Sequence, residues 1–316
     1  MITFLYCIDE NYNPQALASI NSLLQKVSEQ INIVIIHKNP DSFSNYKKAI
    51  TKSPSLKNIK IIKFVNKDYI FPEVDNSHVS EATYYRLFLS EILDDQIQNL
   101  IYIDADVICI NNPIPALYDT FRKFKVSNFT IGAKTTDKYG EIEGNTLFER
   151  LGIFNSYFNA GVMLINFDHW KNKHTTSELL KTLDEIHSKI QYWDQDVLNK
   201  YFDGKYYELD SNLNFLLNVN YEYSNNDLIN IEKNTIFLHY VGSTKPWSIE
   251  GVFKNTSNYY QESYRSIAQE TYHIETAWRT NDIKLLISNI INLKIFSLKK
   301  PIGLVYSFIK KLRIKE

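Results

Sequence analysis

The chain has 316 residues, which is enough for one large domain or for one domain with a small appendage. Hydrophobic residues make up 44% of it and charged residues 22%, as in an ordinary globular protein, and the apolar run at 302–309 is far shorter than the ~20 residues of a membrane-spanning helix. The first apolar run, 2–8, leads directly into two acidic residues and does not resemble a secretory signal. Cys7 and Cys109 fall in apolar segments, which predicts buried free thiols and a reducing, cytoplasmic compartment.

The charge of the chain is unevenly distributed. Although the net charge is only −1, the segment 283–316 holds eight Lys or Arg residues and one acidic residue, a net charge of +7. The rest of the chain therefore carries −8. Such an asymmetry predicts an anionic partner for the basic tail.

Strands and helices alternate over the first 65 residues: the expected strands are 2–8, 31–36 and 59–65, and a helix lies between each pair. The first of these helices has Pro14 at its first position and Asn13 as its cap. Strand–helix–strand alternation favours parallel strands joined by right-handed crossovers. The order of elements therefore indicates the nucleotide-binding α/β class.

The position of the first glycine excludes two common nucleotide-binding motifs. Because no glycine precedes Gly132, neither a G-x-G-x-x-G turn nor a phosphate-cradling G-x-x-x-x-G-K-[ST] loop can follow the early strands. The first strand-to-helix turn instead offers Asp9, Asn11 and Tyr12, whose side chains suit the edge and the flat face of a base or a sugar. The alternative for Tyr12 is that it packs on its own helix.

A pair of aspartates interrupts the apolar strand that we expect over residues 99–110. If the strand continues through them, Asp104 and Asp106 point to the same face. If it ends at Asp104, they line its carboxyl end, where open α/β sheets bind ligands. Buried carboxylates need partners, so a divalent cation explains the pair, and capping of the loop 111–113 is the alternative.

The segments on either side of this strand also carry informative residues. Residues 82–93 predict an apolar helix that buries Arg86, whose guanidinium needs a partner such as Asp104 or a phosphate. Residues 134–155 are polar and lack clear periodicity, as in a mobile flap. A strand at 159–167 follows, and its small first residues allow close approach of a ligand.

Two further motifs present polar groups at the ends of elements. Asp194 can cap a helix while presenting Gln195, although Asp194 and Asp196 can equally serve as ordinary stabilisers of a helix N-terminus. His239 lies at the end of an expected strand, next to a glycine turn and Lys245. That position makes His239 a better ligand candidate than an isolated histidine.

Together these pieces resemble glycosyltransferase family 8, the retaining GT-A-fold enzymes that include glycogenin and the bacterial lipooligosaccharide and lipopolysaccharide galactosyl- and glucosyltransferases. The resemblance rests on six motifs that run in the family's order from Asp9 to Trp247: D-E-N-Y, T-Y-Y-R-L, Y-I-D-A-D-V, F-N-A-G-V-M-L-I-N, D-Q-D-V-L-N and H-Y-x-G-x-x-K-P-W. One such motif would mean little, but six in order make coincidence a poor explanation. The chain is most similar to the lipooligosaccharide galactosyltransferase type.

The resemblance implies an α/β GT-A fold, with a Rossmann-like, mostly parallel central sheet flanked by helices. It implies a catalytic domain over residues 1–254 and a small helical extension with a basic amphipathic tail over residues 255–316. The implied function is retaining, metal-dependent transfer of galactose or glucose from a UDP-sugar to a glycan acceptor, in lipooligosaccharide, lipopolysaccharide or other surface glycan assembly. No nucleic-acid partner is expected.

The resemblance also assigns site residues. The ligands of a Mn²⁺, or of a Mg²⁺ in its place, are Asp104, Asp106 and His239. The residues that bind the nucleotide and its diphosphate are Asp9, Asn11, Tyr12, Asp104, Ala105, Gly242 and Lys245. The residues around the donor sugar are Arg86, Asn159, Asp194 and Gln195, and the last two are the catalytic candidates.

The identity of Gln195 bears on the mechanism. Retention of configuration conventionally requires a carboxylate nucleophile behind the anomeric carbon, and an amide is a poor nucleophile. We therefore favour front-face attack, with covalent participation of Asp194 as the alternative. Competing functions are a glycogenin-like protein that glucosylates one of its own tyrosines, and a UDP-sugar-binding module without catalysis.

The C-terminal residues predict two amphipathic helices. We expect the first, up to about Leu298, to pack on the catalytic domain. The second begins at Pro301, has an apolar face and ends in a basic cluster, which fits a helix that lies on an anionic membrane surface. A peripheral position on the inner face of the cell membrane would bring the enzyme to a lipid-linked acceptor.

Overall fold

A computed structural model of the chain describes residues 1–66, 69–72, 80–141, 146–275 and 280–314. Its main sheet has seven strands, in the spatial order β3 (Leu56–Lys63), β2 (Ile31–His37), β1 (Ile2–Ile8), β4 (Asn99–Ile103), β7 (Ser156–Ile165), β6 (Ile131–Lys138) and β8 (Tyr207–Glu208). Strands β1 to β4 run parallel to one another, and β8 runs parallel to β6. Only β7 is antiparallel to its neighbours. The expected mostly parallel sheet is confirmed.

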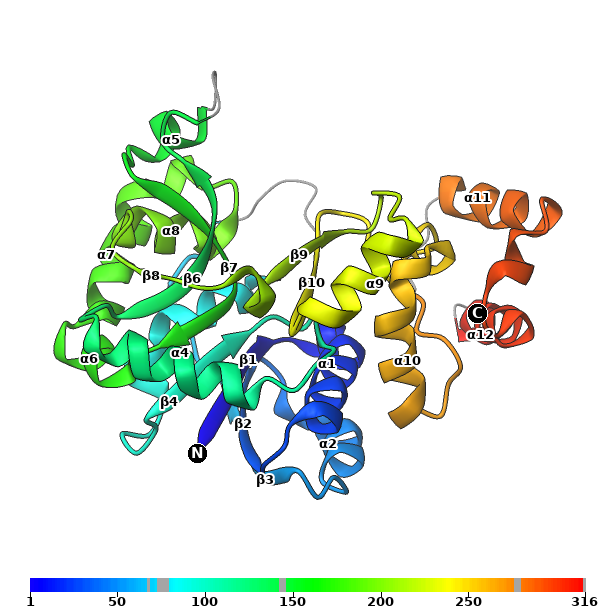
Figure 1. Cartoon of the computed structure of the whole chain (residues 1–316), viewed down its shortest axis with the longest axis horizontal. Helices are drawn as coiled ribbons and strands as arrows, with labels where there is room; N and C mark the ends of the chain where they lie inside the picture. Colours follow the sequence, from blue (N-terminus) through cyan, green and yellow to red (C-terminus); the bar gives the residue numbers. More distant parts are fainter. Residues whose placement is uncertain (67–68, 73–79, 142–145, 276–279, 315–316) are drawn as a thin grey trace.

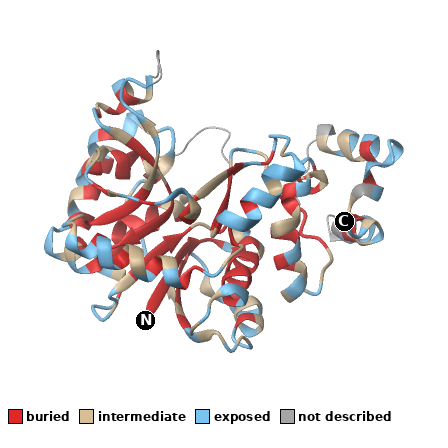
Figure 2. Cartoon of the chain, in the orientation of Figure 1, coloured by how far each residue is buried: buried red, intermediate tan, exposed pale blue. Residues whose placement is uncertain are grey.

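Side chains of the central strands alternate between two apolar layers, as the two-residue period of a strand requires. In β1, Phe4 and Tyr6 belong to one core cluster, while Leu5 and Cys7 belong to the other. The first cluster is covered by α1 (Asn13–Lys26), α4 (Ile114–Val126) and α10 (Asn258–Ile267), and the second by α7 (Thr175–Ile186) and α8 (Trp193–Phe202). Figure 1 shows the helices on both sides of the sheet, and Figure 2 shows its buried centre.

The strand expected over residues 99–110 is in fact two strands that belong to different sheets. β4 ends at Ile103, and β5 (Val107–Cys109) joins a three-stranded sheet with β10 (Phe237–Val241) and β9 (Phe215–Asn218). Between them the chain turns, with the Val107 N–H donating to the Asp104 carbonyl at 3.2 Å. The aspartates therefore lie at the carboxyl end of a strand and not within one, which is the second of the two placements that the sequence allowed.

Other expected elements differ in detail. The first helix begins at Asn13, which does not cap it, because the Asn13 side chain contacts Ser42 at 3.0 Å and His37 at 2.8 Å. The helix expected over residues 82–93 is a 3₁₀-helix, Glu81–Phe88, that continues into a single α-helical turn, α3 (Leu89–Ile92). The expected flap at 134–155 contains part of β6 and a short helix, α5 (Thr146–Leu151), while residues 142–145 lie outside the described residues. Three other α-helices precede the C-terminal pair in the described residues: α2 (Ser44–Ile50), α6 (Phe167–Asn172) and α9 (Asn225–Asn234).

Both C-terminal helices have one face against the body and one face in solvent. In α11 (Thr280–Ile291), Ile287 is 51% exposed and Ile291 72% exposed, but Leu286 packs against a third apolar cluster, as Leu298 also does, so the expected packing of residues up to about Leu298 is observed for one face only. α12 (Pro301–Ile314) buries Leu304 and Phe308 in the same cluster, which also includes Ile295, while Ile302, Val305, Tyr306 and Ile309 stay exposed. That cluster also contains residues of the preceding body: Ile249, Val252, Tyr272 and Ile274. Figure 1 shows the two helices at the edge of the molecule.

Two further contacts hold α12 in place. Gly303 lets the helix approach closely, since a Cβ there would lie 2.3 Å from Thr271 Cγ2. Lys310 forms an ion pair with Glu270, so part of the basic tail is neutralised within the chain.

Among the described residues, no helix is both long and apolar enough to cross a membrane. The division of the chain after residue 254 stays a prediction.

Candidate functional site

A pocket of about 430 Å³ opens where β1 and β4 end, the usual ligand position in an open α/β sheet. It is lined by every site residue that the sequence predicts except Asp9 and Asn11. Those lining residues are Tyr12, Arg86, Asp104, Ala105, Asp106, Asn159, Asp194, Gln195, His239, Gly242 and Lys245. The structure thus brings together residues from both halves of the chain.

The two exceptions, Asp9 and Asn11, contact each other. Asp9 caps the short 3₁₀-helix Glu10–Tyr12 and accepts the Asn11 N–H at 3.0 Å. Its second carboxylate oxygen accepts from Asn11 Nδ2 at 3.4 Å. These contacts hold the turn that carries Tyr12 into the pocket, while the roles of Asp9 and Asn11 in nucleotide binding stay predictions.

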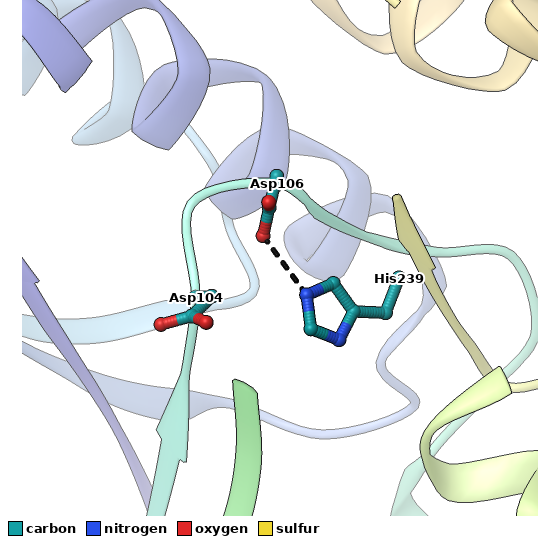
Figure 3. A group of neighbouring side chains, drawn as sticks. All are labelled: Asp104, Asp106 and His239. Atoms are coloured by element: carbon teal, nitrogen blue, oxygen red, sulfur yellow. Dashed lines mark ion pairs between the residues drawn. The ribbon is translucent and has the colours of Figure 1, made fainter. Parts of the chain in front are cut away.

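Three side chains from different elements converge at one side of the pocket (Figure 3). Asp104 follows β4, Asp106 lies in the turn before β5, and His239 belongs to β10. Each offers one ligand atom, and these atoms all lie within 4.8 Å of one another. The antiparallel pairing of β10 with β5, which sets His239 opposite Val107, is what brings the imidazole next to the aspartates.

A chain of hydrogen bonds determines which nitrogen of His239 carries the hydrogen in a neutral ring. The Gly161 N–H, which can only donate, contacts Asn159 Oδ1 at 3.0 Å, and Asn214 Nδ2 donates to the same oxygen at 2.9 Å. Asn214 Oδ1 is thereby turned toward His239 Nδ1, 3.1 Å away. Nδ1 is therefore the nitrogen that carries the hydrogen in a neutral ring, and the lone pair of Nε2 faces Asp106 Oδ1 at 3.3 Å.

This arrangement fits a divalent cation. Asp106 Oδ1 is buried and has no hydrogen-bond partner within the described structure, and a lone pair of His239 points toward it. A cation between the two atoms would satisfy both. Burial alone would raise the pKa of Asp106, but the ammonium of Lys245 beside it outweighs burial and lowers that pKa, which keeps the carboxylate ionised. Two carboxylates and an imidazole suit Mn²⁺ and do not exclude other divalent metals.

Gly161 on β7 leaves the space for this group. A Cβ on Gly161 would lie 2.2 Å from His239 Cε1 and 2.8 Å from Asp104 Oδ2. Since His239 is only 4% exposed, its ring has little room to move aside. Gly161, which lies in the middle of β7, therefore serves the packing of the Asp104, Asp106 and His239 group.

Arg86 is buried beneath the pocket and bound by several groups. Its Nε donates to Asp194, and its Nη1 donates to the Ala160 carbonyl at 2.7 Å and lies 3.6 Å from Asp104 Oδ1. The guanidinium also lies over the Tyr102 ring, 4.2 Å from its centroid. Burial alone would lower the pKa of Arg86, but Asp194 and the other neighbours raise it, so Arg86 stays charged. The carboxylate partner within the protein is mainly Asp194 rather than the expected Asp104, and contact of Arg86 with a phosphate stays a prediction.

Sequence reasoning missed several residues that line the site or orient its side chains. Tyr102, whose hydroxyl donates to Asp104, stands two residues before it in β4, so the period of the strand was a usable signal. Asn214 orients His239, yet it comes from the segment before β9, and no sequence pattern links it to the site. Thr83 and Trp193 also line the pocket.

Comparison with known proteins assigns the chain to a family. The model of glycosyl transferase family 8 matches residues 3–251. The chain belongs to glycosyl transferase family 8. Proteins that the chain resembles include the lipopolysaccharide 1,3-galactosyltransferase of Salmonella typhimurium, which is 29% identical over 191 residues, 58% of this chain and 55% of that protein. The lipopolysaccharide glucosyltransferase WaaO of Escherichia coli is 29% identical over 188 residues, 59% of this chain and 55% of that protein.

The chain thus spans about half the length of these two transferases. General stress protein A of Bacillus subtilis is 25% identical over 291 residues, which cover 87% of this chain and 93% of that protein. Among solved structures, the galactosyltransferase LgtC in complex with donor and acceptor sugar analogs superposes with a TM-score of 0.67 at 22% identity, over 90% of this chain and 100% of LgtC. This likeness confirms the GT-A fold.

Proposed function

We propose that this family 8 protein is a retaining, metal-dependent hexosyltransferase that moves galactose or glucose from a UDP-sugar to a glycan acceptor. The observation that carries the proposal is the group formed by Asp104, Asp106 and His239 at the edge of a pocket that also holds Lys245. The names of the Salmonella and Escherichia coli relatives support an acceptor in lipopolysaccharide or a related surface glycan.

In this proposal the three ligands hold Mn²⁺, or Mg²⁺ in its place, which when bound supplies Lewis-acid stabilisation of the negative charge on the leaving diphosphate. Lys245 contributes a second positive charge at the same place. Its Nζ lies 2.8 Å from Asp106 Oδ2 and 2.6 Å from the Tyr240 carbonyl, so the ammonium is directed at the site. The turn that positions it passes through Gly242 at φ +85°, a conformation that other residues adopt only with strain.

The contacts of Asp194 favour front-face attack over a covalent intermediate. Asp194 is 1% exposed and ion-paired with Arg86, so its use as a nucleophile would leave a buried guanidinium without its main partner. In the front-face route the acceptor hydroxyl attacks the anomeric carbon as the bond to UDP breaks. A leaving phosphate oxygen takes the hydroxyl proton, and the Asp194 charge and the Gln195 amide stabilise the positive sugar ring.

A panel of UDP-sugars, tested with and without Mn²⁺, tests this function. We expect Mn²⁺-dependent release of UDP with UDP-galactose or UDP-glucose and transfer to an added oligosaccharide acceptor. Intact-mass spectrometry of the protein after the reaction separates the alternatives. A gain of hexoses on tyrosine would indicate the glycogenin-like function, and one hexose on Asp194 a covalent mechanism. Binding of UDP-sugar without turnover would leave a non-catalytic module.

Tyr12 tests the nucleotide end of the pocket. If its ring stacks on the base, Tyr12→Ala should weaken UDP binding by about 1 kcal/mol, the scale of an aromatic stacking contact. Titration calorimetry with UDP measures the change, and Tyr118→Ala on the surface of α4 is the control. An unchanged affinity would mean that Tyr12 only packs on its own helix.

We further propose that the C-terminal helices place the protein on an anionic lipid surface. Exposed apolar side chains follow the helical spacing along α11, at Ile283, Ile287, Ile290 and Ile291, and continue with Leu293 and Phe296. The segment 283–316 carries +7, which complements anionic headgroups. The apolar face of α11 and the exposed side chains of Ile302, Val305, Tyr306 and Ile309 on α12 are therefore the surface proposed to enter the lipid interface.

The double variant Ile287→Glu with Ile291→Glu should bind anionic liposomes more weakly at low salt, because burial of an isoleucine side chain contributes about 1.5–3 kcal/mol and a carboxylate repels the lipid. Cosedimentation with such vesicles measures the loss. Ile229→Glu on α9, also an exposed isoleucine at 63%, should bind as the unmodified protein does. Equal sedimentation of all three proteins would refute the surface. Point changes are preferable to removal of α12, which would uncover the third apolar cluster.

A further inference from the structure

The side chain of Gln195 is held at both ends of its carboxamide. Its Oε1 accepts the Ala160 N–H at 3.0 Å, and its Nε2 donates to the hydroxyl of Tyr157 at 3.1 Å. Each of these two atoms keeps one free position, a hydrogen on Nε2 and a lone pair on Oε1. Since Gln195 lines the pocket, these free positions are the ones available to a bound sugar.

The direction of the Tyr157 hydroxyl decides which way this amide points. Tyr157 donates to Asp196 Oδ1 at 2.8 Å, so its oxygen has only lone pairs left for Gln195. A flipped Gln195 amide would set oxygen against that oxygen and N–H against the Ala160 N–H, and both contacts would be repulsive. The Tyr157 and Asp196 pair therefore selects a single orientation of Gln195.

Asp196 also holds the turn that precedes Gln195. It is fully buried, and its Oδ2 accepts the backbone N–H groups of Gln191 at 2.8 Å and Tyr192 at 2.9 Å. Arg150 from α5 completes its contacts with a two-point ion pair, at 2.7 and 3.2 Å. The turn contains Trp193 at φ +47°, a strained conformation for a large side chain that persists only where its surroundings fix it.

We propose that Tyr157 and Asp196 are positioning residues that set the orientation of the Gln195 amide toward the donor sugar, and thereby the rate of transfer rather than nucleotide affinity. Asp196 is then more than a stabiliser of the N-terminus of α8, because its carboxylate acts on Gln195 through Tyr157. The part of the inference that concerns rate rests on the proposed function. The part that concerns the orientation of Gln195 does not.

The test is Tyr157→Phe, which keeps the ring and removes only the hydroxyl. The matched control is Tyr206→Phe, since Tyr206 is likewise buried and its hydroxyl contacts two side chains outside the pocket, Thr135 at 2.6 Å and Ser156 at 2.7 Å. The side-chain amide signal of Gln195, assigned through its loss in Gln195→Ala, should shift in the ¹H–¹⁵N spectrum of Tyr157→Phe. It should stay in place in Tyr206→Phe.

In Tyr157→Phe, kcat for transfer should fall by about 10- to 100-fold, the scale that a displaced catalytic group costs. The Kd for UDP should be unchanged. Tyr206→Phe should match the unmodified protein in both quantities. An amide signal that stays in place, or a kcat equal to that of the control, overturns the proposal. If the unmodified protein transfers no sugar, the proposed function fails, and the amide shift alone then decides whether Tyr157 orients Gln195.

Discussion

Asp106→Asn should lower UDP-sugar turnover by at least about 1000-fold, because several kcal/mol of charge stabilisation would be lost with the cation. An amide lacks the charge that a divalent metal requires, and Asp106 is the carboxylate that meets both His239 and Lys245. The protein should nevertheless fold, since asparagine has nearly the same shape and removes a buried charge rather than a packing contact. Rates of UDP release with added Mn²⁺, together with Mn²⁺ binding followed by electron paramagnetic resonance, measure the effect.

Asp168→Asn on α6 makes the same chemical change at an exposed carboxylate and should retain full activity. A melting temperature of Asp106→Asn close to that of the unmodified protein would separate a lost ligand from a lost fold. If Asp106→Asn keeps full activity in chelator-treated buffer, the assignment of a metal to Asp104, Asp106 and His239 is wrong.

Gly161→Ala should have a comparable effect on Mn²⁺ binding, although it changes no ligand. The added methyl group would lie 2.2 Å from His239 Cε1 and 2.8 Å from Asp104 Oδ2, distances that force the imidazole or strand β7 to move. Overpacking of this kind costs about 1–3 kcal/mol of stability, and the displaced ring would no longer face Asp106. Mn²⁺ affinity and the melting temperature should both fall.

The comparison variant is Gly132→Ala in the neighbouring strand β6. There the added Cβ would meet Leu209 Cδ2 at 3.2 Å, the end of a flexible side chain that can shift by a few tenths of an ångström. This variant should keep its Mn²⁺ affinity. Normal Mn²⁺ binding by Gly161→Ala would show that His239 is not confined by β7 and would weaken the account of the site.

Patterns within short segments predicted the features that depend on residues close together in the sequence. The alternation of strands and helices over the first 65 residues gave the parallel arrangement of β1, β2 and β3, because such connections permit little else. The two aspartates after an apolar strand likewise indicated a ligand site, since buried charges are expensive without partners. The residues that reach this site from distant segments, such as His239 and Lys245, were assigned through the resemblance of their motif to family 8.

What the sequence did not reveal depends on contacts between distant segments. Residues 99–110 are apolar on both sides of the two aspartates, so the sequence allowed either one strand or a strand that ends at Asp104, and the division into β4 and β5 was visible only once β10 paired with β5. Asn214 has no pattern of its own and gains its role from the amides it meets. The two C-terminal helices have similar apolar patterns, and only the fold shows which side chains of each reach the third cluster, with the close contact at Gly303 bringing α12 against Thr271.

The pairing of β5 with β10 has a consequence for the order in which the protein matures. Lys245 and Asp106, which lie 2.8 Å apart in the folded chain, are separated by 139 positions in sequence. During synthesis Asp104 and Asp106 leave the ribosome long before β10 exists, so the first half of the main sheet can assemble while its acidic edge still lacks His239 and Lys245. Closure of the three-stranded sheet is thus the step at which a collapsed chain acquires its candidate metal-binding group. A nascent chain that stops before β10 has both carboxylates and no complete site.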